Sequence, residues 1–329
     1  MTRGFVLGKF MPPHAGHLAL CEAALRLVDQ LTVLVCWLPG DPIPGAQRLA
    51  WMQQLLPQAR VLGFGEAAPQ APADDPAFWP IWQEIVRRVH PEPIDFVFAG
   101  ETYGQELADR LGARFLPLLG RSPDGDPLAR VSASQVRVDP GAHWALVPPP
   151  VRGHFAQTIC LHGPESVGKT QLAARLADHF KTIAVPEYGR THCEMFGTEL
   201  DEEDLLTIGR VQTATIAATR RWCNRRLIAD TDALMTAAWC EMLLDRVPAE
   251  LLEQPKADLY LPLDADVPWV DDGTRLFGEA DRRARFAAVS QSMLERAGVR
   301  WVRIGGSWDE RFAQAVAEIE RLAPSGSKG

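Results

Sequence analysis

The sequence has 329 residues, of which 47% are hydrophobic and 23% charged, enough for two ordinary cores and inconsistent with a disordered chain. Its net charge of −8 argues against a general nucleic-acid binder, which would neutralise successive phosphates with clustered Lys and Arg. No stretch approaches the roughly 20 apolar residues that cross a bilayer, and the six Cys show no Cys-x-x-Cys spacing. We therefore expect a cytoplasmic protein with reduced thiols and neither nucleic-acid nor membrane partners.

The first half of the chain alternates expected strands and helices. A short apolar run at 4–7 leads through a Gly/Pro/His-rich turn into a helical pattern at 18–28, and an apolar run follows at 31–38. This order is typical of a βαβ unit with a parallel sheet. A Pro-, Ala- and Asp-rich loop at 67–76, an aromatic helix and a strand at 96–99 continue the alternation. A Rossmann-like α/β domain is therefore predicted.

A motif with two His lies between the first strand and the first helix. His14 and His17 are three residues apart across a glycine, so a tight turn can direct both imidazoles and the helix N–H groups at one triphosphate. Adenylyl transfer to a phosphate needs positioning and charge neutralisation as pyrophosphate leaves, and no covalent intermediate. A structural role for both His is the weaker interpretation. The candidate residues here are Gly8, Lys9, Phe10, His14, Gly16 and His17.

A second phosphate-binding element is predicted where the pattern Ser-Ala-Ser-Gln-Val-Arg suggests a helix start. Ser132 and Ser134 would present hydroxyl and N–H groups, with Arg137 one turn further on. The pattern is common in proteins, and a plain helix N-cap explains it equally well.

Three consecutive prolines at 148–150 mark the expected junction between two domains, because such a run continues neither a helix nor a central strand. We assign residues 148–152 to the linker and 325–329 to a disordered tail. The α/β alternation then restarts with a helix at 170–180 and with strands expected at 158–161, 182–185, 226–229, 259–263 and 300–304.

Residues 163–170 match the phosphate-loop pattern Gly-x-x-x-x-Gly-Lys-Ser/Thr between an expected strand and helix. Its backbone N–H groups would surround the β-phosphate, Lys169 would neutralise the β- and γ-oxygens, and the Thr170 hydroxyl could ligate Mg²⁺. An accidental Gly-rich turn is a minor alternative. We therefore predict a P-loop kinase domain that uses Mg²⁺ and ATP, with the loop candidates Gly163, Glu165, Ser166, Val167, Gly168, Lys169 and Thr170.

Carboxylates follow two of the later strands. Asp230 is the candidate for holding Mg²⁺, directly or through water, although Asp also commonly ends strands in a solvated turn. Glu187 could accept the proton of an attacking hydroxyl, and Arg190 could hold the transferred phosphoryl group, against an ordinary ion pair or cap as the alternative. Tyr188 and Asp232 are candidate substrate contacts.

A Trp-Val-Asp-Asp-Gly-Thr-Arg segment precedes a cluster of arginines. Arg275 and Arg282 could close over ATP as a kinase lid does, or could belong to a solvated basic helix. Trp269 and Asp272 are further candidate substrate contacts.

These segments together resemble the bacterial NadR family, a bifunctional nicotinamide-nucleotide adenylyltransferase and ribosylnicotinamide kinase, over nearly the whole chain. Many enzymes share the first motif and the phosphate loop, but the segments at 187–190, 230–232 and 269–275, in this order, make the resemblance specific. It implies a kinase domain at 153–324 that converts ribosylnicotinamide and ATP to nicotinamide mononucleotide. An adenylyltransferase domain at 1–147 would then convert nicotinamide mononucleotide and ATP to NAD and pyrophosphate.

The resemblance sets further expectations. Some members carry an N-terminal helix-turn-helix domain, which we do not expect here because the first strand begins by Gly4. Ser134 stands where the family often has Thr, and this change keeps the hydroxyl. Trp79, Trp82 or Trp269 could stack on nicotinamide or adenine, although a given Trp is more often core. A homo-oligomer is compatible with this sequence.

Two alternatives remain. The same transferase signature serves flavin, pantetheine and cytidylyl chemistry, so a fusion enzyme with another vitamin-derived substrate fits the motifs. A nucleotide-sensing regulator with one inactive domain is the other alternative, and the intact motif residues argue against it.

Overall fold

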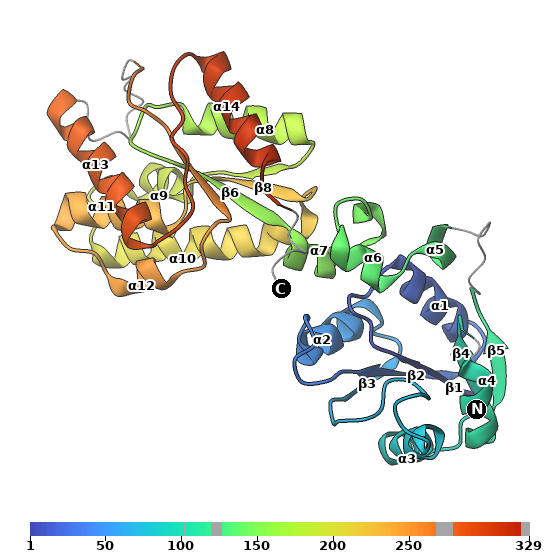
Figure 1. The fold of residues 1–329 in the computed structure, drawn as a ribbon. Helices are drawn as coiled ribbons and strands as arrows, with labels where there is room; N and C mark the ends of the chain where they lie inside the picture. The colour runs from blue at the N-terminus through green and yellow to red at the C-terminus, as the bar shows by residue number, and fades with distance from the viewer. Residues whose placement is uncertain (102, 120–126, 268–278, 324–329) are drawn as a thin grey trace. The chain divides into compact units, whose positions relative to one another are not determined.

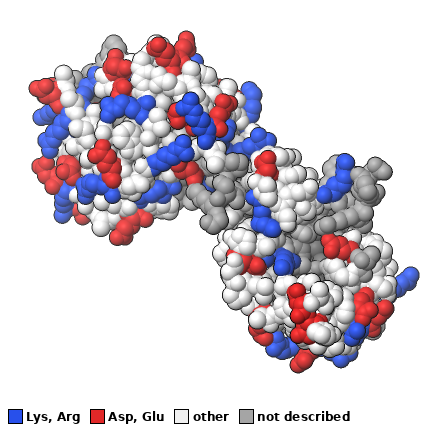
Figure 2. Space-filling view, viewed as in Figure 1, with Lys and Arg blue, Asp and Glu red and all other residues white. Residues whose placement is uncertain are grey.

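The computed structural model describes residues 1–101, 103–119, 127–267 and 279–323. The chain divides into two compact units between Val151 and Arg152, and each unit has its own parallel sheet with helices on both faces (Figure 1). The predicted α/β fold class is confirmed. On the face shown in Figure 2, the described Lys and Arg are interspersed with Asp and Glu on both units.

The sheet of the first unit has five parallel strands in the order β3-β2-β1-β4-β5. Neighbouring β1 and β4 are not consecutive in the chain, so the strand order reverses there and the carboxyl ends of these two strands border a crevice. Successive residues of β2 are buried because both faces of the sheet are covered. The strands are β1 (Arg3–Gly8), β2 (Gln30–Cys36), β3 (Arg60–Phe64), β4 (Phe96–Ala99) and β5 (Arg114–Pro117).

Helices cover both faces of this sheet. The pairs α1 and α2, and α3 and α4, pack on opposite faces, because alternate strand residues such as Val33 and Leu34 belong to separate core clusters. Helix α1 begins at Ala15, three residues earlier than expected, and so includes His17. The helices are α1 (Ala15–Leu25), α2 (Gly45–Leu55), α3 (Phe78–Val89), α4 (Tyr103–Leu111), α5 (Pro127–Arg130), α6 (Ala133–Val138) and a 3₁₀ turn (Trp144–Leu146).

Part of the segment assigned to the linker is helical. Helix α7 (Pro149–Phe155) begins within the proline run. The first N–H groups of a helix have no intrahelical partner and the proline φ suits a helix, so Pro149 and Pro150 are tolerated in the first turn.

The sheet of the second unit has four parallel strands in the order β7-β8-β6-β9. Helices α8 and α14 pack on one face, and α10, α11 and α13 pack on the other (Figure 1). The strands are β6 (Gln157–His162), β7 (Ile183–Val185), β8 (Arg226–Asp230) and β9 (Leu259–Pro262). The helices are α8 (Lys169–Phe180), α9 (Tyr188–Phe196), α10 (Glu202–Thr219), a 3₁₀ turn (Arg220–Trp222), α11 (Ala233–Leu244), α12 (Ala249–Glu253), α13 (Ala280–Arg296) and α14 (Trp308–Glu320).

The strand expected at 300–304 is present only as two isolated bridges. Trp301 pairs with Tyr260, and Ile304 pairs with Leu263, in parallel. Pro262 lies between these two bridges and has no N–H to donate, so the hydrogen-bond ladder is interrupted there.

None of the six Cys forms a disulfide, and five of them are buried. Among the described residues, no helix combines the length and the apolar character needed to cross a membrane.

Candidate active sites

The first unit contains a cavity of about 660 Å³ at the carboxyl ends of β1 and β4. The structure brings both predicted elements of this unit to its wall, although they are more than 100 residues apart in the chain. The predicted residues that line it are Gly8, Lys9, Phe10, His14, Gly16, His17, Trp79, Trp82, Ser132, Ser134 and Arg137.

The two His lie at the N-terminus of α1. Their rings stack with centroids 3.7 Å apart, and the backbone N–H of His14 donates to Nδ1 of His17 over 3.4 Å. The ring of Phe10 meets His17 edge-on at 5.0 Å. A Cβ on Gly16 would lie 2.3 Å from the carbonyl oxygen of Leu128, so only glycine allows this approach. Both imidazoles and the positive end of a helix therefore face one cavity.

Arg137 connects the two elements of the first unit. Its guanidinium donates to the carbonyl oxygen of Met11 and, over 3.1 Å, to Oγ of Ser134. Ser132 is the N-cap of α6, since its Oγ accepts from the backbone N–H of Gln135 over 3.2 Å. The cap interpretation is thus correct, and it coexists with a position on the cavity wall.

The second unit contains a cavity of about 500 Å³ around the phosphate loop. The loop joins β6 to α8, as the sequence predicts. The predicted residues that line this cavity are Gly163, Glu165, Ser166, Val167, Gly168, Lys169, Thr170, Glu187 and Arg190.

The phosphate loop depends on backbone conformations that favour glycine. Gly163 has φ of 117° and Gly168 has φ of 86°. A Cβ on Gly168 would also lie 2.2 Å from the ring of Trp308. Nζ of the largely buried Lys169 donates to the carbonyl oxygens of Gly163 and Pro164 over 3.0 and 2.9 Å, so its charge is held inside the loop.

A carboxylate lies directly behind the loop hydroxyl. Oγ1 of Thr170 donates to Oδ2 of Asp230 over 2.5 Å, and the other oxygen, Oδ1, is buried with no hydrogen-bond partner in the described part of the chain. No cluster of three or more His, Cys, Asp or Glu with metal-binding geometry is found among the described residues. Mg²⁺ usually takes only one or two protein ligands beside phosphate and water, so Thr170 and Asp230 fit the ion.

Glu187 is half-buried in the cavity wall at the start of α9. Burial raises the pKa of its carboxyl, and Asp230 raises it further, whereas Lys169 and Arg190 lower it. A carboxylate with a raised pKa beside a phosphate loop is suited to accept a proton from a hydroxyl.

Known proteins resemble this chain along nearly its whole length. A family model described as an AAA domain matches residues 158–311, which include the phosphate loop. The Trifunctional NAD biosynthesis/regulator protein NadR of Escherichia coli K12 is 26% identical over 350 residues, covering 98% of this chain and 83% of that protein. The protein of the same name from Salmonella typhimurium LT2 is 26% identical over 345 residues, covering 97% of this chain and 83% of its own length. The curated relatives that this chain resembles are thus NadR proteins, at 26% identity.

Two crystal structures of NadR protein share the fold of this chain. One, in complex with NR, gives a TM-score of 0.76 at 22% identity and covers 98% of both chains. The other, in complex with NAD and AMP-PNP, gives a TM-score of 0.76 at 21% identity and covers 100% of this chain and 97% of the other. The fold of both α/β units is therefore shared with NadR protein.

An aromatic wall in the second cavity is missed by the sequence analysis. Trp239 and Phe286 line this cavity, and their ring centroids are 4.5 Å apart at 59°. Trp239 lies in α11, whose residues are buried nearly all round, so no periodicity distinguishes it from core. Trp79 and Trp82 line the first cavity instead, and Trp82 also packs in the core and donates from Nε1 to the carbonyl oxygen of Pro69 over 2.9 Å.

Three predicted site residues of the second unit do not line its cavity. Asp232 is buried as the N-cap of α11, where it accepts from the backbone N–H of Leu234 and, over 2.5 Å, from the hydroxyl of Tyr260. Burial raises the pKa of this carboxyl. A strand-end Asp can serve the following helix as readily as a ligand, and in this structure Asp232 serves the helix, so its contact with substrate stays a prediction.

The other two are Tyr188 and Arg282. Tyr188 packs against the core, and its backbone N–H donates to Gln212 over 2.8 Å. Arg282 is exposed and lies 3.6 Å from the carboxylate of Glu279. The candidates Trp269, Asp272 and Arg275 lie outside the described residues.

Two buried polar residues that hold the backbone near the two cavities also escaped the sequence analysis. Arg48 is fully buried and donates to the carbonyl oxygens of Lys9 and Cys36 over 2.7 and 3.3 Å, with Asp41 as its ion-pair partner at 2.5 Å. Gln212 of α10 accepts from Tyr188 and donates to the carbonyl oxygen of Thr231 over 3.2 Å. No motif marks either residue, because each acts on a segment far away in the sequence.

Proposed function

We propose that this chain carries out two consecutive steps of NAD biosynthesis, one in each unit. ATP would phosphorylate ribosylnicotinamide in residues 153–324, and the resulting nicotinamide mononucleotide would take an adenylyl group from a second ATP in residues 1–147. The observation that carries the proposal is that one chain similar to NadR proteins holds two separate cavities, each with a loop suited to polyphosphate at the carboxyl ends of its own sheet.

In the kinase step, Lys169 and the loop N–H groups would hold the β- and γ-phosphates of ATP. Thr170 and Asp230 would hold Mg²⁺, which supplies positive charge to the phosphate oxygens when bound. Glu187 would accept the proton of the attacking hydroxyl, and Arg190, on the same cavity wall, would stabilise the transferred phosphoryl group.

In the adenylyl-transfer step, the first unit would act by positioning and charge. His14, His17 and Lys9 would face the triphosphate from the N-terminus of α1, and Arg137 would reach it from the facing element. A phosphate oxygen of the mononucleotide would attack the α-phosphorus of ATP. The new P–O bond would form as the bond between the α-phosphorus and pyrophosphate breaks, and the positive groups would stabilise the negative charge of the departing pyrophosphate.

We expect Glu187→Gln to lower kcat of the kinase reaction about 10²-fold, because the amide cannot accept the proton. The KM values for ATP and nucleoside should change little, since the side chain keeps its shape. Steady-state kinetics check this, with Glu203→Gln, an exposed residue paired with Arg210, as the matched control. Kinase activity that survives at half the normal rate would exclude Glu187 as the base.

The aromatic wall of Trp239 and Phe286 would contact the pyridinium ring of the nucleoside, because a flat cation is attracted to an aromatic face. We expect Trp239→Ala to raise the KM for ribosylnicotinamide about tenfold and to leave the KM for ATP unchanged. The control is Trp222→Ala, a Trp that is 59% exposed. Equal rises of both KM values would contradict a specific contact with the nucleoside.

The function itself is tested with the purified chain, ribosylnicotinamide and Mg·ATP, with products separated by chromatography. We expect nicotinamide mononucleotide first and NAD with pyrophosphate next. Turnover only of a flavin, pantetheine or cytidylyl substrate would replace the proposed substrate, and tight ATP binding without turnover in either unit would identify a nucleotide sensor instead.

A further inference from the structure

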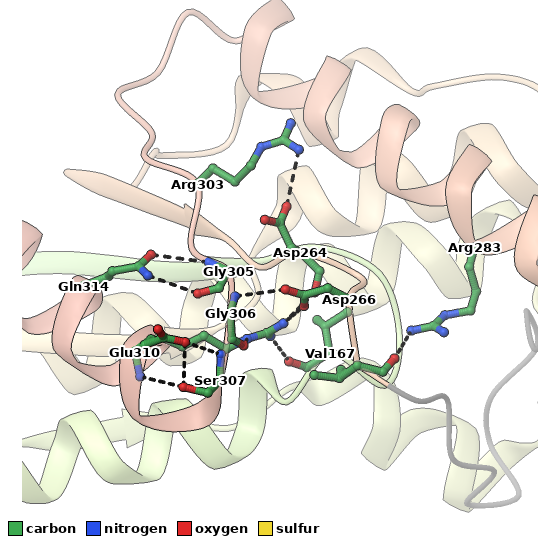
Figure 3. Close-up of polar contacts among 12 residues, drawn as sticks. Val167, Asp264, Asp266, Arg283, Arg303, Gly305, Gly306, Ser307, Glu310 and Gln314 are labelled. Carbon is green, nitrogen blue, oxygen red and sulfur yellow. Dashed lines mark hydrogen bonds and ion pairs between the residues drawn. The ribbon is translucent and has the colours of Figure 1, made fainter.

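A buried cation supports the phosphate loop from behind. Arg311 in the first turn of α14 is 1% exposed and does not line either cavity. Its guanidinium donates to the carbonyl oxygens of Val167 over 2.9 Å, Gly306 over 2.8 Å and Asp264 over 3.1 Å, and it forms an ion pair with Asp266. Figure 3 shows these partners converging from three separate segments of the chain.

The contact with Val167 fixes the direction of the next backbone N–H. In a planar trans peptide the carbonyl and the following N–H point in opposite directions. Because the oxygen of Val167 is held by Arg311 on the outer side of the loop, the N–H of Gly168 points the other way, and Gly168 lines the cavity. An N–H directed into this cavity is a donor for a phosphate oxygen.

The same helical turn also packs against Gly168. The ring of Trp308 occupies the place where a Cβ on Gly168 would lie, and the guanidinium carbon of Arg311 is 5.4 Å from this ring. The loop peptide is thus held by a hydrogen bond on one atom and by an aromatic ring on the next residue.

All three groups of the guanidinium are used. Nε contacts Gly306, one terminal nitrogen contacts Val167, and the other contacts Asp264 and Asp266, which itself accepts from the N–H of Gly306 over 2.9 Å. A buried cation is tolerated only when its donors are satisfied, and the compact ammonium of Lys cannot reproduce this planar arrangement.

We propose that Arg311 is a positioning residue for nucleotide binding in the second unit. It orients the Val167–Gly168 peptide toward the phosphates and does not touch the nucleotide itself. The inference rests on the proposed kinase function for its kinetic test, and on ATP binding alone for its second test.

We expect Arg311→Met to raise the KM for ATP in the kinase reaction about tenfold, the effect of losing one hydrogen bond to a charged group. The KM for ribosylnicotinamide should stay within about twofold, because the aromatic wall is unaltered. Arg311→Lys should fall between Arg311→Met and the natural chain. Adenylyl transfer by the first unit serves as an internal control and should keep its own KM for ATP.

Two further variants keep the test decisive. Arg303→Met is the matched control, because Arg303 is 55% exposed and pairs with the side chain of the same Asp264, at 3.3 Å, without reaching the loop. It should leave both KM values unchanged. Asp266→Asn retains Arg311 but removes the charge of its ion-pair partner, so the guanidinium is held less firmly. If Arg311→Met unfolds, Asp266→Asn takes its place in the comparison.

A purely structural role would lower kcat by reducing the folded fraction while the KM for ATP stays the same, and this result would overturn the proposal. An unchanged KM with unchanged kcat would overturn it equally. Titration of the full chain with a non-hydrolysable ATP analogue separates the two ideas. If the natural chain binds the analogue but phosphorylates no nucleoside, the proposed function fails, whereas about tenfold weaker binding by Arg311→Met still supports the positioning role.

Discussion

Lys169→Ala should lower phosphorylation of the nucleoside about 10³-fold while adenylyl transfer continues at its normal rate. The ammonium is largely buried at the phosphate loop, where electrostatic interactions are stronger than in water. Its present acceptors are two carbonyl oxygens of the loop, at 3.0 and 2.9 Å, so the cation is already placed where a phosphate would arrive. Removing it leaves the charge that develops on the transferring phosphoryl group without its main counterion.

The measurement is a pair of separate assays, one with ribosylnicotinamide and one with nicotinamide mononucleotide as the acceptor. Lys181→Asn provides the control, because Lys181 is exposed at the end of the same helix and its φ of 52° is tolerated by Asn. Loss of both activities in a folded Lys169→Ala protein would show that the two reactions are not divided between the units.

For His17→Ala the expected result is the reverse. Adenylyl transfer should fall about 10²- to 10³-fold, and the kinase reaction should be unaffected. His17 lines the first cavity, stacks on His14 and accepts from its backbone N–H, so its removal takes away a positive or donor group and loosens the second imidazole.

His143→Ala is the matched control, because His143 lies in the same unit and does not line its cavity. Thermal unfolding of each variant separates loss of chemistry from loss of structure. A folded His17→Ala protein that makes NAD at the normal rate would remove the first motif from the proposed mechanism.

The features that could be predicted from the sequence are those written in neighbouring residues. The buried strand at Gln30–Cys36 appears as a mostly apolar run, and the phosphate loop carries its glycines, Lys169 and Thr170 within eight positions. Both signals are local, so no knowledge of the tertiary fold is needed to find them.

The features that could not be predicted depend on which distant segments meet. Arg311 lies 144 residues from Val167, and Arg48 lies 39 residues from Lys9, so neither side chain shows from the sequence which carbonyl it holds. Asp232 illustrates the opposite difficulty. Its place after a strand and before a helix fits a ligand and an N-cap equally, and only the fold shows that it caps α11 and accepts a hydrogen bond from Tyr260.

Irregular backbone was also hard to predict. Pro262 divides the pairing between β9 and residues 300–304 into two isolated bridges, although the apolar pattern at 300–304 is that of a strand. The apolar pattern indicates which residues are buried but not whether each backbone N–H has a partner. The break in the hydrogen-bond ladder can be recognised only once the segment that pairs with residues 300–304 is known.

The hydrogen bonds of Lys169 within the phosphate loop affect the free energy of nucleotide binding. A nucleotide does not meet a freely swinging ammonium, because the Nζ contacts with Gly163 and Pro164 must be exchanged for contacts with phosphate. The binding free energy from each new contact is therefore the difference between the phosphate contact and the carbonyl contact that it replaces. Because the Lys169 side chain is already ordered, it loses little conformational entropy when the nucleotide binds. Short anions such as pyrophosphate or sulfate should also bind to this ordered side chain. They should therefore compete with ATP for the loop although they have no adenine ring.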